Sequence, residues 1–143
     1  MENTFDDDIT TEQALLLPLP IPFTTKLTEG NDEFRHAHGF FECFYVTEGE
    51  IVHECDGKTE SLTVGDAVLI GPGVYHKFTR NKTCIHRDLL ISQKLMYEVC
   101  SFLGENLYDD IAKRKVIRFK LQPGDVLAYE RQVFTFLSYY DVT

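Results

Sequence analysis

The stretch from about Phe34 to Ile91 is a succession of short runs rich in β-branched and aromatic residues, each ended by a glycine-containing turn. The turns are expected at Gly49, Asp56-Gly57, Gly65 and Pro72-Gly73. Strands at this spacing, with no helical pattern between them, are typical of an antiparallel sandwich or barrel. The Asp-Gly pair also predicts a type I′ hairpin between IVHEC and KTESLTV. We therefore expect residues 29–91 to form an all-β barrel.

Residues 1–28 have a different character and are predicted to form an N-terminal arm. Pro18, Pro20 and Pro22 alternate with apolar residues in the segment LLPLPIPF. Proline lacks the backbone N–H that a sheet needs and favours extended backbone. The arm is therefore expected to lie outside the barrel.

Residues 92–143 change to a period of about 3.6 and predict a pair of helices in the same domain. The first is expected to begin after Ser92, as N-cap, and to stop at Gly104; the second is expected to begin at Pro123. The expected apolar faces are Leu95, Met96, Val99, Phe102 and Leu103 on the first helix, and Val126, Leu127, Val133, Phe134, Leu137 and Tyr140 on the second. The face of the second helix would cover an end of the barrel, form a subunit interface, or do both.

Composition excludes several classes of function. The 143 residues carry 14 basic and 23 acidic side chains, a net charge of −9, which repels phosphate backbones. No run approaches the roughly 18 apolar residues that span a bilayer. Three aspartates, Asp6 to Asp8, stand where a secretory signal would carry basic residues. We expect a cytoplasmic protein that neither enters a membrane nor contacts DNA through this chain, with its four cysteines reduced.

The histidines carry the main chemical signal. His36, His38 and Glu42 stand between Gly30 and Gly49 in the pattern G-x5-H-x-H-x3-E-x6-G. On an unbroken strand, residues of equal parity share one face, so these three side chains would point the same way. Phe40 and Phe44 would share that face. Two imidazoles and a carboxylate need a fourth group from another strand to complete a metal site or a polar pocket.

His76 is the candidate for that fourth group. It follows two turns and a buried strand in GDAVLIGPGVYH, and is expected to begin the next strand, with Phe78 two residues later. His53 alternates with Ile51 and Cys55, so it is also expected to face the interior. The pocket candidates are His36, His38, Phe40, Glu42, Phe44, His53, His76 and Phe78.

Imidazole and carboxylate ligands suit one divalent ion such as Fe(II), Mn(II), Ni(II) or Zn(II), with one or two coordination sites left open. In the alternative interpretation the same groups hold no metal and form a hydrogen-bonding pocket for a small polar ligand.

The two histidine-bearing stretches resemble the paired motifs of the cupin superfamily, over about residues 30–81. The first motif matches at every position; in the second, Gly71 replaces the usual proline and Arg80 the usual asparagine. The resemblance implies a double-stranded β-helix, or jelly roll, and gives the role of metal ligand to His36, His38, Glu42 and His76.

A narrower resemblance covers nearly the whole chain. The sequence is similar to the N-terminal effector-binding domain of AraC-type transcription regulators. The similarity lies in the segment HAHGFFECFYVTEGEIVHECDGKTESLTVGDAVLIGPGVYHKF and in CIHRDLLIS after it. Those regulators dimerise through helices after the barrel, and an arm before it covers the ligand. The family's basic helix-turn-helix half is not in this chain, so either it lies in a separate segment or the chain is a stand-alone sensor.

Three hypotheses for the function follow. The first is a sensing and dimerisation domain, not an enzyme, that binds a small polar metabolite such as a sugar, forms a homodimer through its C-terminal helices and reaches DNA only through the missing domain. The second is a small metal-dependent cupin enzyme, an isomerase or dioxygenase, using the same four ligands. The third is a purely structural dimerisation module, which predicts a barrel too full of side chains to admit a ligand.

Overall fold

The computed structural model describes residues 18–80 and 82–140, so the first 17 residues of the predicted arm lie outside the described residues. The strands are β1 (Phe23–Glu29), β2 (Phe41–Cys55), β3 (Lys58–Thr63), β4 (Asp66–Ile70), β5 (His76–Thr79), β6 (Cys84–Ile91) and β7 (Val116–Lys120). The helices are α2 (Gln93–Leu103), α3 (Leu107–Arg114) and α4 (Pro123–Tyr140).

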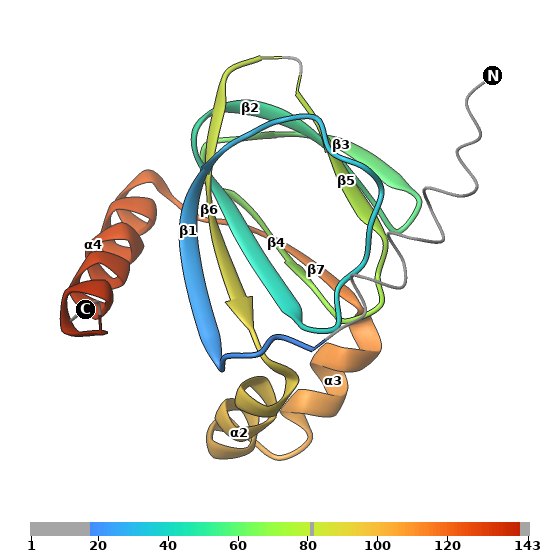
Figure 1. The fold of residues 1–143 in the computed structure, drawn as a ribbon, viewed down its shortest axis with the longest axis vertical. Helices are drawn as coiled ribbons and strands as arrows, with labels where there is room; N and C mark the ends of the chain where they lie inside the picture. The colour runs from blue at the N-terminus through green and yellow to red at the C-terminus, as the bar shows by residue number, and fades with distance from the viewer. Residues whose placement is uncertain (1–17, 81, 141–143) are drawn as a thin grey trace.

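The long strand β2 organises the sheet (Figure 1). Its first half pairs with β4 and β6, and its second half pairs with β3 and β5, always antiparallel. The main order is β1-β6-β2-β4-β7. The predicted antiparallel β architecture is confirmed, but the described strands form an open seven-stranded sheet with β1 and β7 at its edges, so closure into a barrel is not shown.

The hairpin between β2 and β3 forms as its turn chemistry predicts. Asp56 and Gly57 both have positive φ, 51° and 76°, as a type I′ turn requires. Cys55 pairs with Lys58 directly across the turn. The Asp-Gly signal therefore fixed both the turn and the pairing register.

Alternation along β2 separates an inner from an outer face. Phe44, Val46 and Ile51 enter the inner apolar core, together with Val68, Ile70 and Phe78 from neighbouring strands. On the outer face, Phe41 packs against Met96 and Cys100 of α2. Tyr45 packs against Ala67 and Val126 of α4. The C-terminal helices thus bury the outer face, as expected.

The predicted boundaries hold for two helices and fail elsewhere. Ser92 caps α2 by accepting a hydrogen bond from the Leu95 N–H, and α4 begins at Pro123. After β6 the chain forms three helices and a strand instead of a helical pair, because α3 and β7 lie between α2 and α4. The expected arm also ends too late, since residues 23–28 belong to β1, where they pair with β6.

The short α3 and β7 were missed because their patterns are weak. α3 has four charged residues among its eight and no fully buried side chain. β7 pairs with β4 at the edge of the sheet and is mostly exposed. Such elements depend on tertiary contacts more than on local pattern.

A polar contact holds α4 against the sheet. Glu130 accepts hydrogen bonds from Arg87 Nε and Nη2 at 2.9 and 2.8 Å, and from the Tyr45 hydroxyl at 2.8 Å. Bidentate pairs of this kind fix orientation as well as adding energy. Val126 is the one buried residue among the α4 side chains that the structure describes. The placement of α4 therefore depends strongly on the Glu130 contact.

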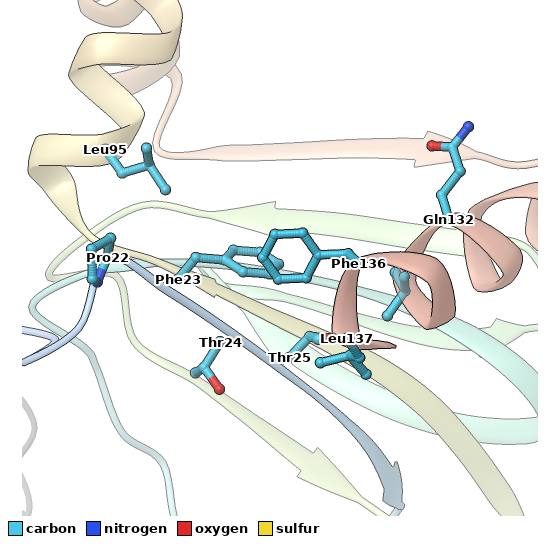
Figure 2. A pocket seen from close by; sticks show the side chains of 9 residues that line it. Pro22, Phe23, Thr24, Thr25, Leu95, Gln132, Phe136 and Leu137 are labelled. Carbon is cyan, nitrogen blue, oxygen red and sulfur yellow. The ribbon is translucent and has the colours of Figure 1, made fainter. Parts of the chain in front are cut away.

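An apolar groove of about 960 Å³ lies between the start of β1, α2 and α4 (Figure 2). Leu95 lines it from α2, and Phe136 meets Phe23 edge-on at 5.3 Å between ring centroids.

None of the helices in the described ranges is long and apolar enough to cross a membrane.

Gly49 in β2 provides a test of this packing. Its φ is 78°, and a Cβ there would lie 1.8 Å from the Thr83 backbone oxygen. We predict that Gly49→Ala lowers the free energy of unfolding by about 3 kcal/mol or more, because backbone must move. The matched control is Gly57→Ala, with φ 76° but nothing within 4 Å, which should cost about 1 kcal/mol. Equal losses in urea unfolding would contradict the close approach at Gly49.

Candidate metal centre and adjoining cavity

The site begins with a backbone bridge between the two histidine motifs. The His36 N–H donates to the His76 carbonyl at 2.9 Å, and the His76 N–H donates back to the His36 carbonyl at 2.8 Å. This isolated antiparallel bridge lies outside the named strands on the His36 side. It sets the segment before β2 against the start of β5 and brings the two imidazoles within reach of each other.

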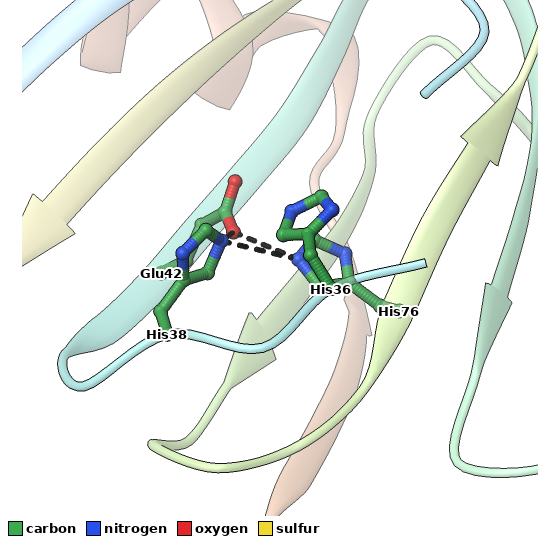
Figure 3. Close-up of side chains that lie close together, drawn as sticks. All are labelled: His36, His38, Glu42 and His76. Carbon is green, nitrogen blue, oxygen red and sulfur yellow. Dashed lines mark hydrogen bonds and ion pairs between the residues drawn. The ribbon is translucent and has the colours of Figure 1, made fainter. Parts of the chain in front are cut away.

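Four side chains converge around this bridge: His36, His38, Glu42 and His76 (Figure 3). One ligand atom from each lies within 4.8 Å of all the others. Glu42 Oε2 is 2.8 Å from His38 Nε2 and 3.1 Å from His76 Nε2. The two imidazole nitrogens are 3.4 Å apart. The predicted four-residue set is therefore brought together.

The Glu42 carboxylate is buried and ionised. Burial alone would raise its pKa, but the contacts with His38 and His76 hold the pKa below its usual range. Although both nitrogens are close, Glu42 Oε2 has no partner with hydrogen-bond geometry, and neither has the buried His38 Nδ1. An unsatisfied buried carboxylate oxygen beside two imidazoles is the arrangement that a cation would satisfy.

His36 and His76 each make a polar contact through Nδ1, which leaves Nε2 available as a ligand atom. His36 Nδ1 lies 2.7 Å from the Phe34 carbonyl, so Nδ1 donates and Nε2 stays unprotonated. His53 Nε2 lies 3.1 Å from His76 Nδ1. Burial lowers the pKa of His36 to about 4 and that of His53 to about 3, which keeps both rings neutral at pH 7. Such outer contacts orient metal-binding histidines.

The residues fit a divalent transition ion. Three imidazoles and one carboxylate are a donor set that Fe(II), Mn(II), Ni(II) and Zn(II) accept. His36, His38, Glu42 and His76 would hold the ion, which would supply Lewis acidity at any open coordination position. The identity of the ion is not fixed by this donor set.

The route by which the ligands converge differs from the predicted one. We expected a single strand through His36, His38 and Glu42, with parity placing all three on one face. β2 begins only at Phe41, and residues 37–40 are irregular. The bridge to His76, not strand alternation, positions His36, while His38 reaches Glu42 across the bend before β2.

A cavity of about 420 Å³ adjoins the cluster. The residues lining it are Lys26, Thr28, Glu29, Asn31, Glu33, Phe34, His36, His38, Glu42, Phe78, His86, Asp88 and Leu90. Of the predicted pocket residues, His36, His38, Glu42 and Phe78 therefore line it.

The other predicted pocket residues lie behind this wall. His76 belongs to the cluster, and His53 supports it from the protein interior. Phe44 is fully buried and meets the Phe78 ring edge-on at 4.9 Å, so the core encloses it. Phe40 stacks on His38 at 4.6 Å. Aromatic parity along the strand predicted the correct neighbourhood but not which rings face the cavity.

Sequence reasoning missed the second polar wall, formed by β1 and β6. Polar and charged side chains on a strand are usually solvated, yet His86 and Asp88 are each only 3% exposed. Asp88 Oδ1 lies 2.8 Å from His86 Nδ1, and Asp88 Oδ2 accepts from the Thr28 hydroxyl at 2.6 Å. The available signal was the alternation in CIHRDLLIS, where His86 and Asp88 share one parity with Leu90.

Comparison with known proteins supports the same fold. Residues 24–84 match the family model Cupin_2, described as a cupin domain. An RmlC-like cupin from Shewanella frigidimarina is 26% identical, with a TM-score of 0.48, over 50% of this chain and 67% of its own. No curated protein matches the sequence.

Two structures of ToxT from Vibrio cholerae match more of the chain. Apo ToxT K231A has a TM-score of 0.55 and 14% sequence identity over 83% of this chain. ToxT bound to (E)-4-(8-methylnaphthalen-1-yl)but-3-enoic acid has a TM-score of 0.59 and 10% sequence identity over 81% of this chain. In both cases the match covers 49% of ToxT, so the chain spans about half of that protein. At this identity the likeness concerns the fold alone. Together with the domain match, it shows that this chain has a cupin fold.

Metal titration tests the centre. We predict that the protein binds one Zn²⁺ or Ni²⁺ per chain and that Glu42→Gln lowers the affinity about 100-fold, since it removes the one charged ligand. His53→Asn should cost about tenfold by freeing the His76 ring. The control is Glu60→Gln, which removes a carboxylate that pairs with Lys58 and Arg118 on β3 and β7. Isothermal titration calorimetry would contradict the site if the Glu42→Gln and Glu60→Gln variants bound the metal ion with the same affinity.

Proposed function

We propose that this chain is the small-molecule-sensing and dimerisation domain of an AraC-type bacterial transcription regulator. In this proposal a small polar metabolite, a sugar being one candidate, enters the cavity beside the histidine cluster. Ligand binding then changes the subunit contacts made by the C-terminal helices. DNA recognition belongs to a separate helix-turn-helix domain.

The observation that carries the proposal is the extent of the fold likeness to ToxT, an AraC-type regulator. The cupin domain model matches only residues 24–84, whereas each ToxT match covers more than four-fifths of this chain. The likeness therefore reaches beyond the cupin strands into the C-terminal helices. One of the ToxT structures is bound to a small organic acid, which supports a ligand-binding role for such a domain.

The position of β6 suggests how a ligand in the cavity would affect the contacts of α4. His86, Asp88 and Leu90 line the cavity, while the intervening Arg87 points outward to Glu130 of α4. A ligand shifts such an equilibrium only as far as it binds one arrangement better than the other. Contacts on the inner face of β6 are thus one residue away from the contact that places α4.

The surface of α4 supports the dimerisation part of the proposal. Leu127 is 56% and Phe134 75% exposed, so these two members of the predicted apolar face are uncovered in the single chain. Large uncovered apolar side chains on one helix are typical of a protein–protein contact. A second copy would bury them.

Light scattering tests the dimer. We predict that the wild-type chain is a dimer and that Phe134→Glu makes it a monomer, because the added charge would be buried in the interface. Lys113→Glu, at an exposed position on α3, is the control and should remain dimeric. A Phe134→Glu chain that stays dimeric would exclude this helix as the interface.

A blocked cavity tests the sensing part. Metabolites are screened by thermal shift, and we predict that a true effector raises the melting temperature of the wild type and alters its monomer–dimer equilibrium. It should do neither in Leu90→Trp, whose indole would fill the cavity from β6. Leu27→Trp, at a half-exposed position on β1, is the control. Effectors that stabilise Leu90→Trp equally would place binding elsewhere.

The metal-dependent enzyme remains the second candidate, favoured by the four-ligand cluster with room for substrate beside it. Elemental analysis of protein purified without a metal-affinity column tests it. One equivalent of iron or manganese, with turnover of any substrate, would favour catalysis over sensing. The cavity of about 420 Å³ argues against the purely structural module, which predicted a filled interior.

A further inference from the structure

The wall of the cavity contributed by β1 and β6 carries an oriented imidazole. Asp88, as a carboxylate, only accepts hydrogen bonds, so the 2.8 Å contact places the proton of His86 on Nδ1. Nε2 is then an acceptor. Among the described residues no hydrogen bond engages Nε2, and His86 lines the cavity with only 4% of its side chain exposed. Within the described ranges, the fully buried side-chain atoms without a hydrogen-bond partner are His38 Nδ1 and Glu42 Oε2. His86 Nε2 is not one of them, so this unpartnered nitrogen is accessible from the cavity.

The packing around His86 holds this orientation. Its ring lies against Phe78 at 4.9 Å and approaches Phe44 at 5.9 Å between centroids. Thr28 donates to Asp88 Oδ2 and fixes the carboxylate behind the imidazole. The unused acceptor is therefore pre-positioned and backed by a negative charge, a setting that favours a positively charged donor.

The charged groups around the cavity favour the same kind of ligand. Four acidic side chains line it, Glu29, Glu33, Glu42 and Asp88, against one ammonium group, Lys26. Glu29 pairs with Arg80 at 3.5 Å, and Glu42 faces the histidine cluster. Glu33 lines the cavity with 34% of its side chain exposed and accepts from the Phe78 N–H at 3.2 Å. Burial, together with the nearby charge of Glu42, raises the pKa of Glu33 to about 8, so this group is mostly protonated at pH 7.5. Asp88 is therefore the carboxylate of this wall that lacks a cationic side chain in hydrogen-bond contact.

We propose that the effector carries an ammonium group, which donates to His86 Nε2 under the charge of Asp88. This inference rests on the proposed function, because it names the chemical class that the sensing cavity takes. An anionic metabolite would place its charge beside the Asp88 carboxylate and against an imidazole nitrogen that has no proton to offer.

Three probes with one carbon skeleton test the charge preference: 1-amino-1-deoxy-sorbitol, sorbitol and gluconate, which differ only at one terminal group. They are titrated into the full chain at pH 7.5 after dialysis against a chelator, so that the affinity of gluconate for metal ions does not contribute. We expect the amine to bind about tenfold tighter than sorbitol, the scale of one charge-assisted hydrogen bond, and gluconate to bind weakest.

Two variants assign the preference to the wall. Asp88→Asn keeps the shape and removes the charge, and should reduce the preference for the amine over sorbitol to less than about threefold. His86→Gln should reduce it as well, which keeps the test valid if either variant folds poorly. Glu29→Gln removes a carboxylate already paired with Arg80 and should leave the preference unchanged.

Gluconate or sorbitol binding as tightly as the amine overturns the inference, as does an Asp88→Asn chain that keeps the full preference. Failure of the amine to bind also overturns it. None of these results decides the proposed function, because the metabolite screen with Leu90→Trp tests the cavity with ligands of any charge.

Discussion

Two backbone hydrogen bonds between His36 and His76 are the contact on which the rest of the site depends. They join a segment before β2 to the first residue of β5, 40 positions later in the chain. Without this bridge the two histidine motifs would belong to separate parts of the sheet. With it, three imidazoles meet the Glu42 carboxylate in a buried position. Backbone pairing is insensitive to side-chain identity, so the fold supplies the meeting point and the sequence supplies the ligands.

The two polar walls of the cavity are built in different ways. At the histidine cluster, His36 and His76 are anchored through Nδ1, while Glu42 Oε2 and His38 Nδ1 lack hydrogen-bond partners. At the other wall, both oxygens of Asp88 are satisfied, and the imidazole of His86 keeps one free nitrogen. The first wall is incomplete without a cation, whereas the second is complete and offers an acceptor. A ligand between them meets two distinct chemical environments.

Local chemistry determined what could be predicted from the sequence. The Asp56-Gly57 turn, the Ser92 cap and the proline at the start of α4 are encoded by adjacent residues and appear where expected. The cluster was found because its residue types and spacing are specific. Its geometry was not, since the bend before β2 replaces the expected strand. The wall of His86 and Asp88 escaped because charged residues on a strand are usually solvated, and only pairing with both β1 and β2 buries them.

Because α4 makes few buried contacts with the sheet, we expect it to be less stable than the strands. The strands share an apolar core, whereas α4 relies on Val126, the Phe23–Phe136 ring contact and the ionic contact at Glu130. Elements with few buried contacts open at a lower free energy than the global unfolding of the domain. Amide protons of α4 would accordingly exchange with solvent before those of β2 and β6. None of the described residues that line the cavity belongs to α4, so local opening of this helix would remove no side chain from the cavity wall.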